Sequence, residues 1–264
     1  MKKALTLAGS DSSGGAGIQA DLKTFQENDV YGMTALASIV AMDPDNNWNH
    51  EVFPIDAKIV EKQLNTILSV GIDAMKTGML GSVDIIELGA KKIDEHGLKN
   101  VVIDPVMVCK GEDEVLQPEN TDAMRELLVP RAAIVTPNLF EAWQLAQTGP
   151  IKTIDDMKEA AAKIYELGAQ NVIIKGGTGL NTNKAVDLFY NGQQFILLEK
   201  DKLHTTYNHG AGCTFAAAIT ANLAKGKSVE DAVKRAKEFV TAAIKHGWKL
   251  NEYVGPVMHG AFYK

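Results

Sequence analysis

The sequence has few cysteines, only two among 264 residues. It contains no Cys-x-x-Cys pair and no His-Glu-x-x-His, which argues against dithiol redox chemistry and the common zinc sites. It also lacks the Gly-x-Ser-x-Gly elbow of many serine hydrolases and the Walker A lysine motif. These absences argue against the common hydrolases, a zinc centre and a P-loop.

Long apolar runs and basic runs are missing as well. No window approaches the ~20 apolar residues of a membrane span, and the apolar start Ala4–Ala8 is too short for a signal peptide. Together with the scarcity of cysteine, this favours a cytoplasmic protein without a membrane partner. The formal net charge is -6, so nucleic acid is not expected as a partner either.

Buried strands alternate with amphipathic helices along the whole chain. Glu51–Phe53 can form an edge strand, and Asn191-Gly192 predicts a β-hairpin between residues 185–190 and 194–198. The composition, 45% hydrophobic and 23% charged, is ordinary for a globular protein. Since no linker divides the chain, we expect one doubly wound α/β domain over residues 1–264, with a mostly parallel sheet.

The stretch His209–Phe215 is the first candidate functional element. Gly210 and Gly212 precede an alanine-rich helix, so several backbone N–H groups at the helix start lack an intrahelical partner. These donors and the helix dipole together predict an anion site, such as one for a phosphate. Cys213 lies in the first turn, where a thiol is expected to have a lowered pKa. The alternative is a glycine-rich turn into a buried helix.

A second candidate is the loop Gly9–Gly17, which follows the strand Ala4–Ala8 and precedes a helix. Its spacing differs from the dinucleotide pattern Gly-x-Gly-x-x-Gly, and Asp11 and three serines supply polar groups instead. In open α/β sheets the loop after a strand's carboxyl end binds ligands. We therefore expect this loop to bind the substrate, although a plain linker is the alternative.

Asp104 stands at the end of the strand Val101–Ile103, just before a proline. A carboxylate at this position can hold Mg²⁺ or a phosphate-bound water, and the alternative is a cap on a turn. The mixed polar loop Val106–Glu114 that follows can form a lid.

Three further polar residues follow later strands. Asn138 and Glu141 share one face of a predicted helix start, although a capping arrangement would explain both. Lys175, followed by two glycines, can reach a nucleotide phosphate, and the alternative is an exposed lysine. A polar loop, acidic residues, a lysine and an anion site together suit phosphoryl transfer, which depends on positioning and charge neutralisation.

Five motifs in order along the chain carry a resemblance to a known family: Gly9–Gly17, Lys76–Met79, Asp104–Met107, Thr136–Glu141 and His209–Cys213. They resemble the hydroxymethylpyrimidine-phosphate kinase and pyridoxal kinase branch of the ribokinase superfamily, over nearly the whole chain. The resemblance implies a three-layer αβα, ribokinase-like fold with an antiparallel edge hairpin and a lid at about residues 106–117. It also implies phosphoryl transfer from ATP to a hydroxymethyl group, with Mg²⁺ as cofactor, in a homodimer.

The resemblance also assigns roles by position. Cys213 stands where the wider superfamily carries an aspartate base, beside an anion hole formed by Gly210, Ala211 and Gly212. Asp104 and Glu141 are expected to hold Mg²⁺. The expected nucleotide contacts are Asp104, Asn138, Lys175, Asp187 and Gly212. The expected substrate contacts are Gly9, Ser10, Asp11, Gly17, Met42, His50, Gly78, Met79 and Val106.

Two positions bear on the substrate. Pyrimidine kinases of this branch usually have a glutamine near Met42 and a small apolar residue at Cys109, and this chain has neither. Methionine cannot offer the paired donor and acceptor that an aminopyrimidine edge requires. A thiol at Cys109 can add reversibly to an aldehyde, which pyridoxal has.

We therefore hypothesise a kinase for pyridoxal, and also for pyridoxine and pyridoxamine, in which Cys213 activates the substrate hydroxymethyl group and Cys109 captures the aldehyde. Hydroxymethylpyrimidine kinase activity is the alternative within the kinases. A non-catalytic ligand-binding or thiol-sensing protein is the alternative from another class.

Overall fold

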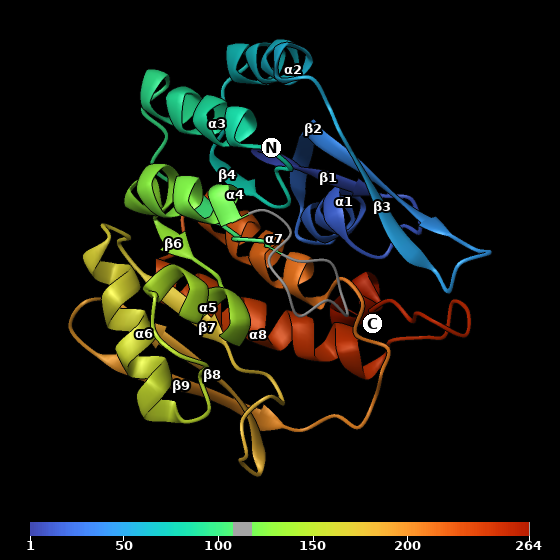
Figure 1. Ribbon diagram of the computed structural model, residues 1–264, viewed down its shortest axis with the longest axis vertical. Coiled ribbons are helices and arrows are strands. Elements are labelled where there is room, and N and C mark those ends of the chain that lie inside the picture. Colours follow the sequence, from blue (N-terminus) through green and yellow to red (C-terminus); the bar gives the residue numbers. More distant parts are fainter. Residues whose placement is uncertain (108–117, 264) are drawn as a thin grey trace.

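The computed structural model describes residues 1–107 and 118–263 (Figure 1). Nine strands within these residues form one sheet, in the order β3-β2-β1-β4-β5-β6-β7-β8-β9. The strands are β1 Lys2–Asp11, β2 Val30–Asp43, β3 Asn49–Pro54, β4 Ala74–Thr77, β5 Val101–Ile103, β6 Ile134–Val135, β7 Val172–Lys175, β8 Lys184–Tyr190 and β9 Phe195–Asp201.

The centre of the sheet is parallel and both of its edges are antiparallel. Neighbouring strands from β2 to β7 run parallel. At one edge β3 pairs antiparallel with β2, and at the other edge β7, β8 and β9 pair antiparallel. The predicted mostly parallel sheet and the hairpin of β8 and β9 are confirmed, and the predicted edge strand at Glu51–Phe53 is part of β3.

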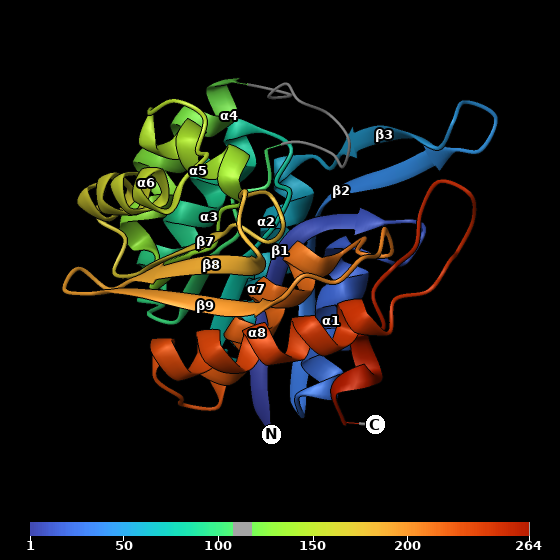
Figure 2. The same cartoon turned by 90° about the horizontal axis from the view of Figure 1, so that it is seen from below.

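Helices cover both faces of the sheet, which makes the three predicted layers (Figure 2). One face carries α2 to α6, and the other carries α1, α7 and α8. The helices are α1 Gly17–Glu27, α2 Ala57–Ser69, α3 Val83–Glu95, α4 Pro118–Ala123, α5 Leu139–Ala146, α6 Ile154–Glu166, α7 Ala211–Ala224 and α8 Val229–Lys245. The described part of the chain has no helix with the length and apolarity needed to cross a bilayer.

Helix α7 is buried on every side, unlike its neighbours. Every residue from Thr214 to Ala224 is buried, because the helix lies among the sheet, α1 and α8. Its small alanine side chains let these elements approach closely. Helix α8 is amphipathic and begins at Ser228, whose hydroxyl accepts a hydrogen bond from the backbone N–H of Asp231.

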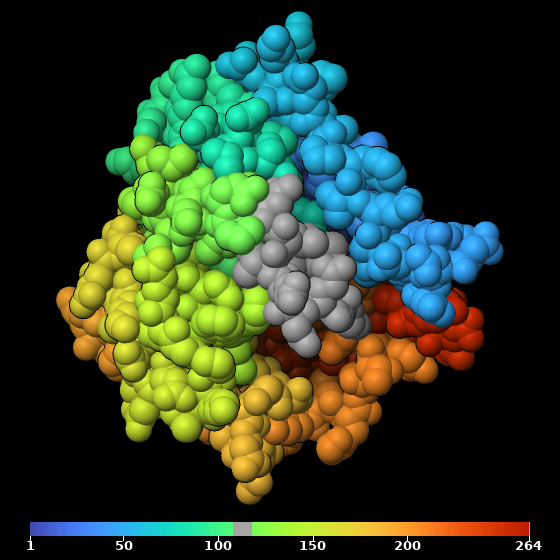
Figure 3. Space-filling model, viewed as in Figure 1, coloured from blue at the N-terminus to red at the C-terminus, as the bar shows by residue number. Residues whose placement is uncertain are grey.

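The hairpin of β2 and β3 projects beyond the body of the sheet (Figure 1). Figure 3 shows the loop near the C-terminus, in red, beside the tip of this hairpin, in blue. Trp48 at the tip stacks on Tyr253 of that loop, with ring centroids 6.4 Å apart and ring planes 13° apart. The hairpin tip is therefore held by a segment about two hundred residues further along the chain.

Candidate active site

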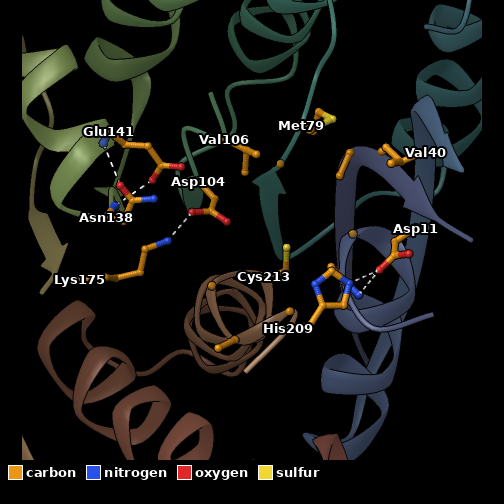
Figure 4. A pocket seen from close by; sticks show the side chains of 18 of the residues that line it. Asp11, Val40, Met79, Asp104, Val106, Asn138, Glu141, Lys175, His209 and Cys213 are labelled. Carbon is orange, nitrogen blue, oxygen red and sulfur yellow. Dashed lines mark hydrogen bonds and ion pairs between the residues drawn. The ribbon is translucent and has the colours of Figure 1, made fainter. Parts of the chain in front are cut away.

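The carboxyl ends of the parallel strands meet at one edge of the sheet, and a cavity of about 610 Å³ lies there. Figure 4 shows Asp11 and His209 on one side of it, Asp104 and Lys175 on the other, and Cys213 between them. The residues predicted from the sequence that line this cavity are Gly9, Ser10, Asp11, Gly17, Met42, His50, Gly78, Met79, Asp104, Val106, Asn138, Glu141, Lys175, Gly210, Ala211, Gly212 and Cys213.

The start of α7 forms a turn that needs glycine. Gly210 has a positive φ of 80°, and a Cβ on it would lie 1.8 Å from the carbonyl oxygen of Gly15. This close approach presses the helix start against the loop after β1. A Cβ on Gly212 would lie 3.4 Å from Nζ of Lys175, so an ammonium group stands directly beside the first turn. The N-terminus of α7 and a cation therefore lie side by side, a combination that favours an anion, although the N–H of Ala211 already donates to the carbonyl oxygen of Asn208 at 3.1 Å.

A carboxylate that follows β5 and a lysine at the end of β7 form an ion pair in front of the intervening strand β6. Nζ of Lys175 lies 2.8 Å from Oδ1 of Asp104, and the hydroxyl of Thr136 donates to the same oxygen at 2.9 Å. Burial opposes the charge on Lys175, but the neighbouring carboxylates of Asp104 and Glu141 keep its pKa above the ordinary value. The ammonium is therefore positively charged at neutral pH.

Asn138 and Glu141 form a reciprocal capping box at the start of α5. The backbone N–H of Glu141 donates to Oδ1 of Asn138 at 2.8 Å, and the N–H of Asn138 donates to Oε2 of Glu141 at 2.8 Å. The capping interpretation is thus confirmed, and both side chains also border the cavity. Burial raises the pKa of Glu141 to about 7; the cation of Lys175 lowers it, and the nearby Asp104 carboxylate raises it.

Two carboxylates suit a magnesium ion at this place. The described residues contain no group of three or more His, Cys, Asp or Glu that could bind a metal. Mg²⁺ commonly binds through one or two carboxylates, with water and phosphate oxygens completing its shell. The buried carboxyl of Glu141 is only partly ionised at neutral pH, and a divalent ion beside it would favour its ionised form. The donor set therefore fits Mg²⁺.

Asp11 and His209 join the loop after β1 to the turn before α7. Nε2 of His209 lies 2.7 Å from Oδ2 of Asp11, and both side chains are buried. Burial opposes ionisation of Asp11, but His209 and the backbone N–H groups of Ser13 and Ala16 lower its pKa to about 2. No local sequence pattern predicts this pairing, because the two residues are 198 positions apart.

The expectation of a lowered pKa for Cys213 is wrong for this structure. Burial raises the pKa of the thiol to about 12, although the cation of Lys76 and the N–H of Gly17 lower it. Asp21 and Asp104 raise it further. The helix dipole lowers a thiol pKa only modestly, and here the loss of hydration on burial raises the pKa by more than the dipole lowers it.

A second cavity of about 410 Å³ adjoins the first and shares Asn138, Lys175, Asn208, Ala211 and Gly212 with it. Asp187 lines this second cavity and not the first. Its Oδ2 lies 2.6 Å from Nζ of Lys237 on α8, and its Oδ1 accepts the N–H of Gly177 at 3.1 Å. Lys237 was not predicted as a site residue, since a lysine in an amphipathic helix normally lies in solvent.

Cys109 and most of the expected lid at residues 106–117 lie outside the described residues. Val106 is described, and it lines the first cavity. The cavity also has two polar contributors that the sequence did not single out, Lys76 and Asn208. Lys76 was noted only as part of a motif, because a strand lysine has no local signal for a role in a cavity.

An αβα fold in which a glycine-rich helix start and a lysine lie between two adjoining cavities is typical of a class of protein, the small-molecule kinases. Lys175 at that junction and the carboxylates of Asp104 and Glu141 in the first cavity fit the class, because phosphoryl transfer requires charge neutralisation and alignment. The comparison with known families makes the assignment specific. The model of the phosphomethylpyrimidine kinase family matches residues 11–258, and the chain belongs to this family.

Similar proteins within the family are known in bacteria. A pyridoxine kinase of Bacillus subtilis is 64% identical over 262 residues, covering 99% of this chain and 97% of the relative. A hydroxymethylpyrimidine/phosphomethylpyrimidine kinase of the same organism is 44% identical, covering 98% and 95%. The structure of the pyridoxal kinase from Staphylococcus aureus in complex with AMP-PCP and pyridoxal superposes with a TM-score of 0.95 at 55% identity, covering 100% and 95%.

Proposed function

We propose that this protein transfers the terminal phosphoryl group of ATP to the 5′-hydroxymethyl group of pyridoxal, giving pyridoxal 5′-phosphate. Pyridoxine and pyridoxamine carry the same hydroxymethyl group and are further substrates. The observation that carries the proposal is that Lys175 and Gly212 border both cavities. A phosphate held at this junction can be reached from a nucleotide on one side and an alcohol on the other.

The relatives support pyridoxal as the ring that binds. The chain is 64% identical to a pyridoxine kinase but 44% identical to a hydroxymethylpyrimidine/phosphomethylpyrimidine kinase. Met42 and His50 are register partners on β2 and β3, and both line the cavity. A thioether at this wall provides an apolar contact for a pyridine ring and offers no donor to an aminopyrimidine.

The chain's own residues have separable tasks in the transfer. The first turn of α7, from Gly210 to Cys213, and the ammonium of Lys175 bind the phosphoryl group and stabilise its negative charge. In this proposal Cys213, which lines the cavity, accepts the proton of the substrate hydroxyl. With a pKa of about 12 the thiol is almost fully protonated in the free protein, so little thiolate is present to act as a base, but a loose phosphoryl-transfer transition state requires little of a base.

Asp104 and Glu141 are the residues that would hold Mg²⁺, which supplies positive charge to the phosphates when bound. A test that does not depend on activity is the thermal stability of Glu141→Gln. Glutamine keeps the capping box but removes a buried carboxylate, so the variant is expected to be at least as stable as the parent at pH 8. Stabilisation of the protein by Mg²⁺ together with AMP-PCP should weaken at the same time. Unchanged stabilisation would argue against Glu141 as a ligand.

Cys109 is proposed to hold the aldehyde of pyridoxal. Its sulfur forms a bond to the aldehyde carbon, the C=O double bond becomes a single bond, and the thiol proton moves to the oxygen, giving a hemithioacetal. Replacing Cys109 by alanine should then reduce turnover of pyridoxal more than turnover of pyridoxine, which has no aldehyde. Equal losses on the two substrates would contradict aldehyde capture and leave the kinase assignment intact.

The decisive experiment measures ADP release with pyridoxal, pyridoxine and hydroxymethylpyrimidine in parallel. We expect kcat/KM for pyridoxal to be highest. The family membership and the 44% identical relative make hydroxymethylpyrimidine kinase activity the second candidate. A higher kcat/KM for hydroxymethylpyrimidine than for pyridoxal would overturn the main proposal in its favour.

The same proposal includes a homodimer, one kinase domain over residues 1–264 with a lid at about 106–117, and a cytoplasmic location. Exposed apolar side chains on the projecting hairpin, Ile39 and Phe53, provide a surface for a second copy. Light scattering on the purified protein tests this, with a mass twice the 28.5 kDa of one chain expected. A scattering mass of a single chain at micromolar concentration would contradict the dimer.

A further inference from the structure

A fully buried ion pair lies on the α7 side of the sheet, behind the active-site cavity. Nζ of Lys76 on β4 is 2.9 Å from Oδ2 of Asp21 on α1, and both side chains have no solvent exposure. The hydroxyl of Thr6 donates to the same carboxylate oxygen at 2.6 Å. Thr6 and Lys76 are register partners on β1 and β4, so adjacent strands hold both groups facing α1.

The fold by itself does not account for this pair. Removing two opposite charges from water costs several kcal/mol per ion, and an apolar pair of similar volume is often equally or more stable. The pairing is also incomplete, because Oδ1 of Asp21 is buried and has no hydrogen-bond partner among the described residues. A buried polar group without a partner often occurs where a site has a role beyond packing, and Lys76 borders the cavity.

The ammonium of Lys76 is directed at the cavity. Lys76 borders the cavity that Cys213 also lines, and a Cβ on Gly78 in the cavity wall would lie 3.4 Å from Nζ. Lys76 is the largest influence that lowers the pKa of the Cys213 thiol, and the thiolate in turn raises the pKa of Lys76. The other charges that act on the thiol are the carboxylates of Asp21 on α1 and Asp104 after β5, which oppose it. The thiolate also acts on Lys175 at the end of β7.

We propose that Lys76 is a positioning residue of the phosphoryl transfer: its ammonium, held in place by Asp21, stabilises the thiolate of Cys213 that receives the substrate's proton. The catalytic role of Lys76 in this inference rests on the proposed function. The stabilisation of the Cys213 thiolate by the Lys76 ammonium, however, can be measured without any substrate. Lys76 acts through Cys213, and a charge at this place reduces the free energy needed to form the anion.

The test uses a chain with a single thiol. The sequence has two cysteines, so Cys109→Ala leaves Cys213 alone, and this side chain retains some exposure in the cavity. The rate of its alkylation by iodoacetamide is measured from pH 7 to pH 9, where it follows the thiolate fraction. Two variants in this background remove the cation: Lys76→Met alone, and Asp21→Asn with Lys76→Met, which leaves no unpaired buried charge.

We expect Lys76→Met to slow alkylation by about 3-fold to 30-fold. This range corresponds to a pKa rise of one to three units, about half of which is offset because a more basic thiolate is a better nucleophile. The double variant should slow it in the same direction, since the effect of Lys76 on the thiol exceeds that of Asp21. If Lys76→Met alone fails to fold because Asp21 is left as an unpaired buried charge, the double variant still measures the effect of the lost cation.

Thr6→Val is the matched control in the same cluster. It removes the hydrogen bond to Asp21 and lowers stability, but it changes no charge, so the alkylation rate should stay within about 2-fold of the parent. An alkylation rate in the folded double variant equal to that of the parent would overturn the inference. So would an equally large drop in Thr6→Val. Neither result bears on which vitamin the enzyme phosphorylates, because the assay contains no nucleotide and no pyridoxal.

A kinetic readout separates positioning from general damage. In the chain that retains Cys109, the double variant should lower kcat by about tenfold and change the KM for ATP by less than about 2-fold, because the interaction matters when the proton moves. A rise in KM with unchanged kcat would contradict the role assigned to Lys76.

Discussion

Individual carboxylates in the site differ in ionisation because their neighbours differ. Asp11 is buried, yet hydrogen bonds from His209, Ser13 and Ala16 lower its pKa to about 2. Glu141 is also buried, and its capping bonds and the nearby lysine do not compensate, so its pKa is about 7. The first carboxylate is therefore a permanent anion, and the second can be ionised fully by a cation that binds beside it.

The low pKa of Asp11 predicts a pH dependence of stability. Its pKa is about 2 in the folded protein and 3.8 ordinarily, so its ionised form stabilises the fold above pH 3.8 and this contribution is lost as the pH falls toward 2. The shift corresponds to about 2 kcal/mol. We expect Asp11→Asn to lower the melting temperature clearly at pH 6 and much less near pH 2.5, as followed by circular dichroism. An equal difference at both pH values would contradict this.

Lys175 should matter for catalysis far more than an ordinary surface lysine. Lys175→Met removes the ammonium beside the first turn of α7, and a loss of about 100-fold or more in kcat/KM is expected, as for the loss of one donor to a developing charge. Lys184→Met is the control, since Lys184 is exposed and pairs with Asp201 at the surface. A comparable loss in the control would show that the effect is not local to the site.

At the scale of elements, the start of α7 depends on one glycine. Gly210→Ala would place a Cβ 1.8 Å from the carbonyl oxygen of Gly15 in addition to the strain of a left-handed alanine. Gly226 is a matched control, because it has a similar φ of 83° and no atom within 4 Å of a Cβ.

We expect Gly226→Ala to cost on the order of 1 kcal/mol in unfolding free energy and to keep activity. Gly210→Ala should cost several times more and should lose activity even at temperatures where it remains folded, because the helix start must move. Urea unfolding and turnover of pyridoxal check both variants. Similar unfolding free energies for Gly210→Ala and Gly226→Ala would show that the backbone around Gly15 moves away from the new Cβ at little cost, and would contradict this prediction.

At the scale of the whole molecule, two adjoining cavities draw on elements from both halves of the chain. Asp11 and Cys213 face one cavity, Asp187 and Lys237 line the other, and Lys175 borders both. A nucleotide whose phosphates reach from the second cavity to the α7 turn would contact strands and helices from both faces of the sheet. Its binding should therefore stabilise the whole fold.

We expect AMP-PCP with Mg²⁺, at about 100 times its Kd, to stabilise the protein by about 2.7 kcal/mol, or about 5–10 °C in melting temperature. AMP lacks the two terminal phosphates that we propose to reach the α7 turn, so it should stabilise much less at the same concentration. Equal shifts for the two nucleotides, measured by thermal unfolding, would show that the turn does not hold the terminal phosphates.

The sequence determined the order of elements and the glycine-rich loops, because local patterns govern both. Alternating buried strands and amphipathic helices required a mostly parallel sheet, and the carboxyl ends of parallel strands meet at one edge. Residues at the ends of different strands, such as Asp11, Asp104 and Lys175, could therefore be assigned to one site from the sequence. The glycines around residues 210–212 indicated an anion site for the same reason, since a helix start exposes its N–H groups.

Only the tertiary structure decided the charges around that site. The pKa of Cys213 depends on burial and on Lys76, Asp21 and Asp104, which belong to other elements, so the helix start alone predicted the wrong direction. The pairing of Asp11 with His209 likewise joins residues 198 positions apart. Local propensity and periodicity act over a few residues, whereas desolvation and Coulomb interactions depend on which side chains the folded chain brings within a few ångströms of each other.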